Sequence, residues 1–114
     1  MFFIKEIEDT LENIKVWNID TFPEATLGTQ LLKLEEELKE HQLCKNDDLK
    51  ELADVFIVVG GLRRFNSLIG YQFERLFSLS SQDMDRLLEL VHKKMRINLK
   101  RKWKNVNGYY HHEE

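Results

Sequence analysis

Apolar residues recur every three or four positions along much of the chain. The first such set predicts an amphipathic helix over about residues 3–15, because this spacing places its members on one helical face. These residues are Ile4, Ile7, Leu11 and Ile14. Residues 17–22 interrupt the spacing and are expected to end this helix.

A second helix is predicted over about residues 22–43. Thr21 precedes Phe22-Pro23-Glu24, which resembles a helix start with Thr21 as the N-cap, proline in the first turn and Glu24 completing a capping box. The residues expected on its core face are Leu27, Leu31, Leu34 and Leu38.

A third helix is predicted from about residue 49 to residue 62, after a turn at residues 44–48. It is apolar on nearly all sides, which is typical of a helix at the centre of a bundle or at a subunit interface. Gly60 and Gly61 indicate either that the helix ends there or that a close neighbour needs the missing side chains.

The later part of the chain predicts two more helices. A short one is expected around residues 69–77. The last begins at Ser80, with Asp83 three residues on, and is expected to reach about Trp103. Its inward residues are expected to be Met84, Leu87, Leu88, Val91, Met95 and Leu99. We find no strand-like alternation, so the expected fold is an all-α bundle of four to five helices.

The 114 residues provide for one domain, residues 1–114, with a modest core. Because a chain of this size has few helices to cover the apolar third one, a homo-oligomer, dimer or tetramer, is expected. The one cysteine and the short apolar run at the N-terminus favour a cytoplasmic protein that does not enter a membrane.

The charge is distributed unevenly. Residues 1–89 carry 10 Lys and Arg against 18 Asp and Glu, whereas residues 90–114 carry 7 against 2. Solvated helix faces of opposite sign would account for this asymmetry. The alternative is that the acidic part binds a cation and the basic part binds an anion.

Two acidic pairs lie at helical spacing. Glu37 and Glu40, next to Glu36, share a face of the second helix, and Glu51 and Asp54 share a face of the third. Asp54 is followed by eight uncharged residues, so it enters a buried region where an unpaired carboxylate is costly. Facing pairs on antiparallel helices would form a four-carboxylate cluster suited to Mg²⁺ or Mn²⁺.

Simpler explanations exist for these acids. A glutamate-rich solvated face explains the second helix, and salt bridges would satisfy the third. The basic partners available for such bridges are Lys33, Lys39, Arg63 and Arg64.

The last helix is strongly basic, with no acid between Glu89 and Glu113. Lys94, Asn98 and Arg101 follow at spacings of four and three, on one face. Such a run is typical of a solvated face or a nucleic-acid patch. Beside a metal cluster it would instead neutralise a triphosphate.

Two segments together resemble the MazG-like branch of the all-α nucleoside triphosphate pyrophosphatases, of the small phage and bacterial type. The first is Thr21-Phe22-Pro23, then Gln30 to Glu37, Glu40 and the pair Glu51 and Asp54. The second runs from Lys94 through Asn98, Arg101 and Trp103 to Gly108-Tyr109-Tyr110-His111-His112. The resemblance covers roughly residues 17–112.

This resemblance implies a magnesium-dependent enzyme, with manganese as a substitute, that hydrolyses ribo- or deoxyribonucleoside triphosphates to monophosphate and pyrophosphate and so controls the nucleotide pool. It implies Glu37, Glu40, Glu51 and Asp54 as metal ligands and Lys94, Asn98 and Arg101 as phosphate contacts. Glu36, Glu37 and Glu40 are the catalytic candidates, with Glu36 positioning a water. Further substrate-binding candidates are Lys33 and, for the base, Trp17, Phe22 and Trp103.

Two functions of other classes remain open. One is a helical interaction module in which the acids only solvate the surface. The other is nucleic-acid binding through residues 93–104, although the acidic remainder of the chain would repel a long polyanion.

Overall fold

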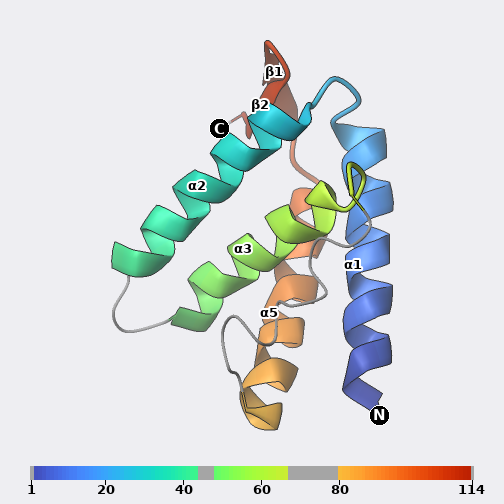
Figure 1. Cartoon of the computed structure of the whole chain (residues 1–114), viewed down its shortest axis with the longest axis vertical. Coiled ribbons are helices and arrows are strands. Elements are labelled where there is room, and N and C mark those ends of the chain that lie inside the picture. Colours follow the sequence, from blue (N-terminus) through green and yellow to red (C-terminus); the bar gives the residue numbers. More distant parts are fainter. Residues whose placement is uncertain (1, 44–47, 67–79, 114) are drawn as a thin grey trace.

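The computed structural model describes residues 2–43, 48–66 and 80–113. This part of the chain is mostly helical, as predicted. It contains four helices and one antiparallel two-stranded sheet (Figure 1). The elements are α1 (Phe2–Thr21), α2 (Leu27–Leu43), α3 (Asp48–Leu62), α5 (Ser81–Asn98), β1 (Trp103–Val106) and β2 (Tyr109–His112).

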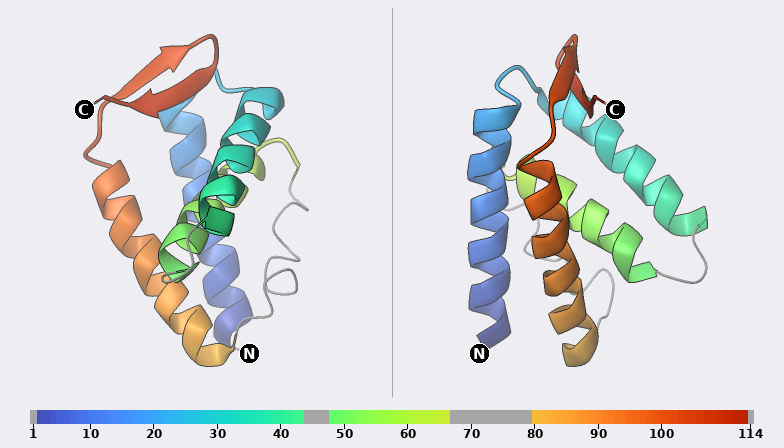
Figure 2. Two further views of the ribbon diagram at one scale, coloured as in Figure 1. Left: turned by 90° about the vertical axis from the view of Figure 1, so that its left-hand side faces the viewer. Right: turned by 180° about the vertical axis from the view of Figure 1, so that it is seen from behind.

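Helix α3 is the centre of the fold. It packs against α1, α2 and α5, and Figure 2 shows it crossing between the nearly parallel axes of α1 and α5 on one side and α2 on the other. Its buried residues include Leu52, Ala53, Val55, Phe56 and Leu62. The apolar character of α3 is therefore explained within one chain, and it no longer argues for an oligomer.

Helix α1 extends to Thr21, six residues further than predicted. Its last turn continues the buried stripe of Ile7, Leu11 and Ile14 with Asn18, a polar residue that hydropathy alone does not mark as buried. Close approach to α3 explains the two glycines, because a Cβ at Gly60 would lie 2.7 Å from Cγ2 of Ile14.

Helix α2 starts five residues later than predicted, at Leu27. Thr21 ends α1, so the capping box of Thr21 and Glu24 is wrong. The cap is formed by Thr26 and Thr29 instead: the Thr29 N–H donates to Oγ1 of Thr26 at 3.1 Å, and the Thr26 N–H donates to Oγ1 of Thr29 at 2.9 Å. These two bonds satisfy N–H groups that a helix start leaves unpaired.

The expected core face of α2 is also partly wrong. Leu34 and Leu38 pack against the core, but Leu27 and Leu31 are exposed by 44% and 46%. Two polar residues of this helix, Gln30 and Glu37, are buried. The inward face of α2 thus carries polar groups as well as leucines.

Helix α5 begins where it was predicted, with the Ser80 side chain accepting from the Asp83 N–H at 3.1 Å. It ends at Asn98 rather than near Trp103, so the expected core residue Leu99 is 66% exposed. Met84, Leu87, Leu88 and Val91 are buried, and Met95 packs against the core.

A β-hairpin follows, which the sequence reading missed. Strands β1 and β2 pair with Trp103 opposite His112 and Val106 opposite Tyr109. Asn107 and Gly108 have φ values of 53° and 86°, and an Asn-Gly pair between two strands favours such a turn. The hairpin lies beside the first turns of α2 (Figure 1).

The expected turn at residues 44–48 and the short helix at residues 69–77 lie at least partly outside the described residues. Among the helices that are described, none is both long and apolar enough to cross a membrane.

Candidate functional site

A cavity of about 320 Å³ opens between α1, α2, α3, α5 and the hairpin. Ten of the residues predicted for the site line it, and they come from segments far apart in the sequence. These are Trp17, Phe22, Lys33, Glu37, Glu40, Asp54, Lys94, Asn98, Arg101 and Trp103.

Three carboxylates converge at one side of this cavity. Glu37, Glu40 and Glu51 each place one oxygen within 4.8 Å of the others. Glu37 is only 9% exposed, and Oε2 of Glu37 and Oε2 of Glu51 are buried without a hydrogen-bond partner among the described residues. Burial, and next the negative charge of Asp54, raise the pKa of Glu37 to about 7.

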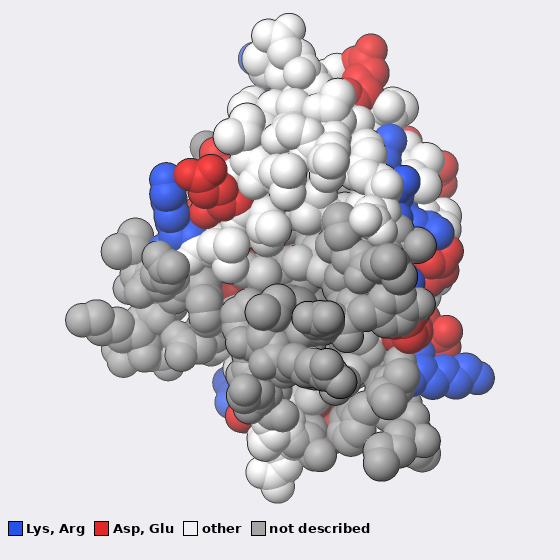
Figure 3. Space-filling model, in the orientation of Figure 1, with Lys and Arg blue, Asp and Glu red and all other residues white. Residues whose placement is uncertain are grey.

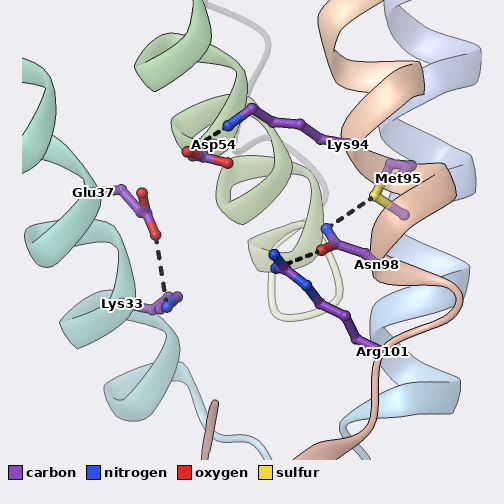
Figure 4. Close-up of polar contacts among 7 residues, drawn as sticks. All are labelled: Lys33, Glu37, Asp54, Lys94, Met95, Asn98 and Arg101. Atoms are coloured by element: carbon purple, nitrogen blue, oxygen red, sulfur yellow. Dashed lines mark hydrogen bonds and ion pairs between the residues drawn. The ribbon is translucent and has the colours of Figure 1, made fainter. Parts of the chain in front are cut away.

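Asp54 does not join these three oxygens. Its Oδ2 accepts from Nζ of Lys94 at 2.8 Å, and Figure 4 shows this contact bridging α3 and α5. On the α2 side of the cavity, Nζ of Lys33 lies 3.6 Å from Oε1 of Glu37, which is one turn further along the same helix. The predicted four-carboxylate cluster is therefore three carboxylates with a fourth, Asp54, held by a lysine.

Arg101 and Asn98 stand next to Lys94 (Figure 4). Nη1 of Arg101 donates to Oδ1 of Asn98 at 3.1 Å, and the Asn98 amide contacts the sulfur of Met95 at 3.8 Å. A smaller cavity of about 210 Å³ continues from these residues and adds Lys50 and Lys93 to its lining. Lys93, Lys94 and Arg101 thus gather on the α5 side of the site, whereas Lys33 lies beside Glu37 on α2.

The other end of the cavity is aromatic. The Phe22 ring lies 5.1 Å from Trp17 and 4.8 Å from both Trp103 and Tyr110, centroid to centroid. Edge-to-face contacts such as those of Phe22 with the two tryptophans stabilise aromatic clusters. Trp103 and Tyr110 reach this place only because the hairpin docks there, with the Glu24 N–H donating to the Tyr110 hydroxyl at 3.2 Å.

Several lining residues were not among the predicted site residues. They are Asn18, Gln30, Ile57, Val58, Tyr110 and His112. Nδ2 of Asn18 donates to Oε1 of Gln30 at 3.3 Å. A polar residue at a position where the helical stripe calls for an apolar one, as at Asn18, is the signal that would have identified this pair.

Two predicted site residues do not line the cavity. Glu51 belongs to the glutamate group without bordering the cavity. Glu36 is exposed on α2, beside Tyr109, whose pKa is raised by burial and then by its side-chain contact with Glu36.

The glutamate group fits a hard divalent cation. Three carboxylates around one point offer only oxygen ligands, and two buried oxygens have no partner in the described part of the chain. A divalent cation bound there would offset the cost of burying the charged form of Glu37.

These features define a mostly helical protein with a cavity that carries carboxylates on α2, basic side chains on α5 and aromatic rings at its end. No protein-family model matches the chain, and no curated protein or solved structure matches it.

Proposed function

We propose that this chain is a cytoplasmic, magnesium-dependent nucleoside triphosphate pyrophosphohydrolase of the MazG-like type. The observation that carries the proposal is the composition of one cavity: converging carboxylates, cationic side chains facing them and aromatic rings beyond. Such a site matches the three parts of a nucleotide, since a metal and cations bind phosphates and aromatic rings bind a base.

Each group has a separate role in this proposal. Glu37, Glu40 and Glu51 hold the cation, which when bound stabilises negative charge on phosphate oxygens. Lys94 and Arg101 contact the same phosphates from α5. Asp54, now paired with Lys94, orients that lysine and lies near enough to Glu37 to raise its pKa.

Glu37 is also suited to proton transfer. Its carboxylate borders the cavity, as does that of Glu40, so these two groups are the proposed acceptors of the proton that the attacking water loses. Glu36 lies outside the cavity lining, so the proposed mechanism gives it no contact with the substrate.

The test is a screen of nucleoside triphosphates with magnesium, in which the products are identified. We expect monophosphate and pyrophosphate, no turnover in EDTA, and a loss of about a hundredfold or more in Glu37→Gln. Glu35→Gln is the matched control, since Glu35 is on the same helix but exposed and pairs with Lys39 at 3.3 Å. Release of orthophosphate by the pure protein would rule out the assigned bond.

Self-association is a second proposal, and it now rests on α2. Leu27, Leu31 and Leu32 are 44–54% exposed, and Figure 3 shows few charged side chains over the hairpin and the first turns of α2. A second copy of this chain is the proposed occupant of this leucine face, because two such faces can bury each other's exposed leucines.

A further inference from the structure

The aromatic end of the cavity contains a polar pair to which the proposed function assigns no role. Asn18, in the last turns of α1, is 3% exposed, and Gln30, in the first turn of α2, is 6% exposed. Both side chains line the cavity. Buried amides are stable only when their hydrogen bonds are made, so the atoms they bond to determine which way each amide faces.

Arg64 determines the orientation of Asn18. Nη1 of Arg64 lies 3.0 Å from Oδ1 of Asn18. A guanidinium can only donate, so the Asn18 atom that faces it is the oxygen, and the Asn18 amide nitrogen points the other way.

Asn18 in turn determines the orientation of Gln30. Its nitrogen, which can only donate, lies 3.3 Å from Oε1 of Gln30. The Gln30 oxygen is thereby occupied, and Nε2 of Gln30 is the atom left over. None of the described residues forms a hydrogen bond with that nitrogen.

Further contacts fix the positions of Arg64, Asn18 and Gln30. Nη1 of Arg64 also donates to the backbone oxygens of Asn18 at 3.3 Å and Phe22 at 2.8 Å. Gly61 leaves the space that Asn18 occupies, because a Cβ there would overlap the Asn18 amide. The amide of Gln30 is therefore a preoriented donor rather than a group free to turn over.

The position of Gln30 matches that of a base when phosphates bind at the glutamates. Gln30 precedes Glu37 by seven residues, which is two turns and about 10 Å along α2. It bonds Asn18, the neighbour of Trp17. Tyr110, also in the lining, accepts the Glu24 N–H, so the proton of its own hydroxyl is available to donate.

We propose that Gln30 selects the nucleobase by donating to a ring carbonyl oxygen, and that the site prefers bases with a carbonyl over bases with an amino group at the same ring position. Uracil would be preferred to cytosine, and hypoxanthine to adenine, because an amino group finds no acceptor on Gln30. Asn18 and Arg64 are positioning residues. The inference rests on the proposed function in one respect, which is that the phosphates bind at the glutamate end of the cavity.

The unaltered protein provides the first test. dUTP and dCTP differ at ring position 4, where an oxygen replaces an amino group, and ITP and ATP differ in the same way at position 6. We expect kcat/KM to favour dUTP and ITP by about tenfold or more, since leaving a buried polar group unpaired costs that much. Equal values, or a preference for the amino partner, overturn the inference.

Asn18→Asp tests the relay, by which we mean the hydrogen bonds that run from Arg64 through Asn18 to Gln30. The carboxylate can bond Arg64 with one oxygen and accept from Gln30 with the other, so Gln30 must turn its nitrogen toward residue 18 and its oxygen toward the cavity. We expect the preference to move toward dCTP by about tenfold. Asn13→Asp, which adds the same charge at an exposed position of α1, should keep the original preference.

Gln30→Glu is the second test of the relay and is used if the Asn18→Asp protein does not fold. One carboxylate oxygen accepts from Asn18 and the other becomes an acceptor in the cavity, so the dUTP preference should again be lost. A folded variant of either kind that still prefers dUTP as strongly as the unaltered protein contradicts the relay.

Binding of monophosphates separates this inference from the reaction. The rise in melting temperature with dUMP should exceed that with dCMP, without any hydrolysis. If no triphosphate is hydrolysed but dUMP binds better, the base preference stands and the reaction is wrong. If triphosphates are hydrolysed without discrimination, the reaction stands and the base preference is wrong, and failure of both assays removes both.

Discussion

Replacing the single residue Asp54 tests whether its carboxylate serves catalysis or folding. Its ion pair with Lys94 is partly exposed, with side-chain exposures of 31% and 28%, so we expect Asp54→Asn to cost at most about 1 kcal/mol of unfolding free energy. Pyrophosphate release should fall by about a hundredfold or more, because Lys94 loses its orienting partner. Urea unfolding and initial rates measure the two effects. A variant that is much less stable but fully active would mean that Asp54 is structural.

Glu37 makes the metal-free protein sensitive to pH. Burial raises its pKa from 4.5 to about 7, so the folded state binds this proton more tightly than the unfolded state does. The stabilisation is complete below the unfolded pKa and is lost as the pH rises through about 7. We expect the melting temperature in EDTA to fall over this range, and Glu37→Gln to flatten the fall. Magnesium at a hundred times its dissociation constant should restore about 2.7 kcal/mol above pH 7.

At the scale of the elements, the contact between α1 and α3 depends on Gly61. Gly61→Ala would drive a methyl group into Asn18, and we expect a loss of about 1–3 kcal/mol. Gly28→Ala is the matched control in a helix: its nearest neighbour outside the helix backbone, Oγ1 of Thr26, is 3.8 Å away, so alanine should stabilise α2 by about 0.5–1 kcal/mol. Urea unfolding of both variants checks this, and equal effects would show that α1 and α3 are not so closely packed.

The hairpin shows how one element completes a site made by others. Asn105 donates to a carboxylate oxygen of Glu24, in the connection between α1 and α2, and Gly108 lies against the backbone oxygen of the same residue. These contacts hold Trp103 and Tyr110 over Phe22. The aromatic end of the cavity therefore depends on residues at both ends of the chain.

At the scale of the whole molecule, the leucine face of α2 predicts self-association. We expect sedimentation at micromolar concentration to give at least twice the chain mass of 13.7 kDa, because burying exposed leucines stabilises a complex. Leu31→Lys should shift the protein toward the monomer, whereas Val16→Lys, at a site 50% exposed on α1, should not. A monomeric unaltered protein would contradict this prediction.

Across the whole molecule, the main helices were predicted from the sequence, whereas the hairpin was not. Helices with a regular apolar stripe, such as the one through Leu11 and the one through Leu87, were located from the sequence because spacing within one helix depends on near neighbours alone. The hairpin was missed because Trp103 and the basic residues before it were read as a continuing helix, although Asn107-Gly108 is a turn signal.

The residue types of the candidate site and their spacing within each helix follow from the amino-acid sequence alone, as in Glu37 with Glu40 and Lys94 with Asn98 and Arg101. The packing of the helices is what joins Glu51 to the other glutamates and sets Asp54 against Lys94. Packing also buries Gln30 and brings Tyr110 to Glu24, 86 residues away in the chain. Spacing within a helix follows from 3.6 residues per turn, whereas contacts between elements depend on how whole faces pack together.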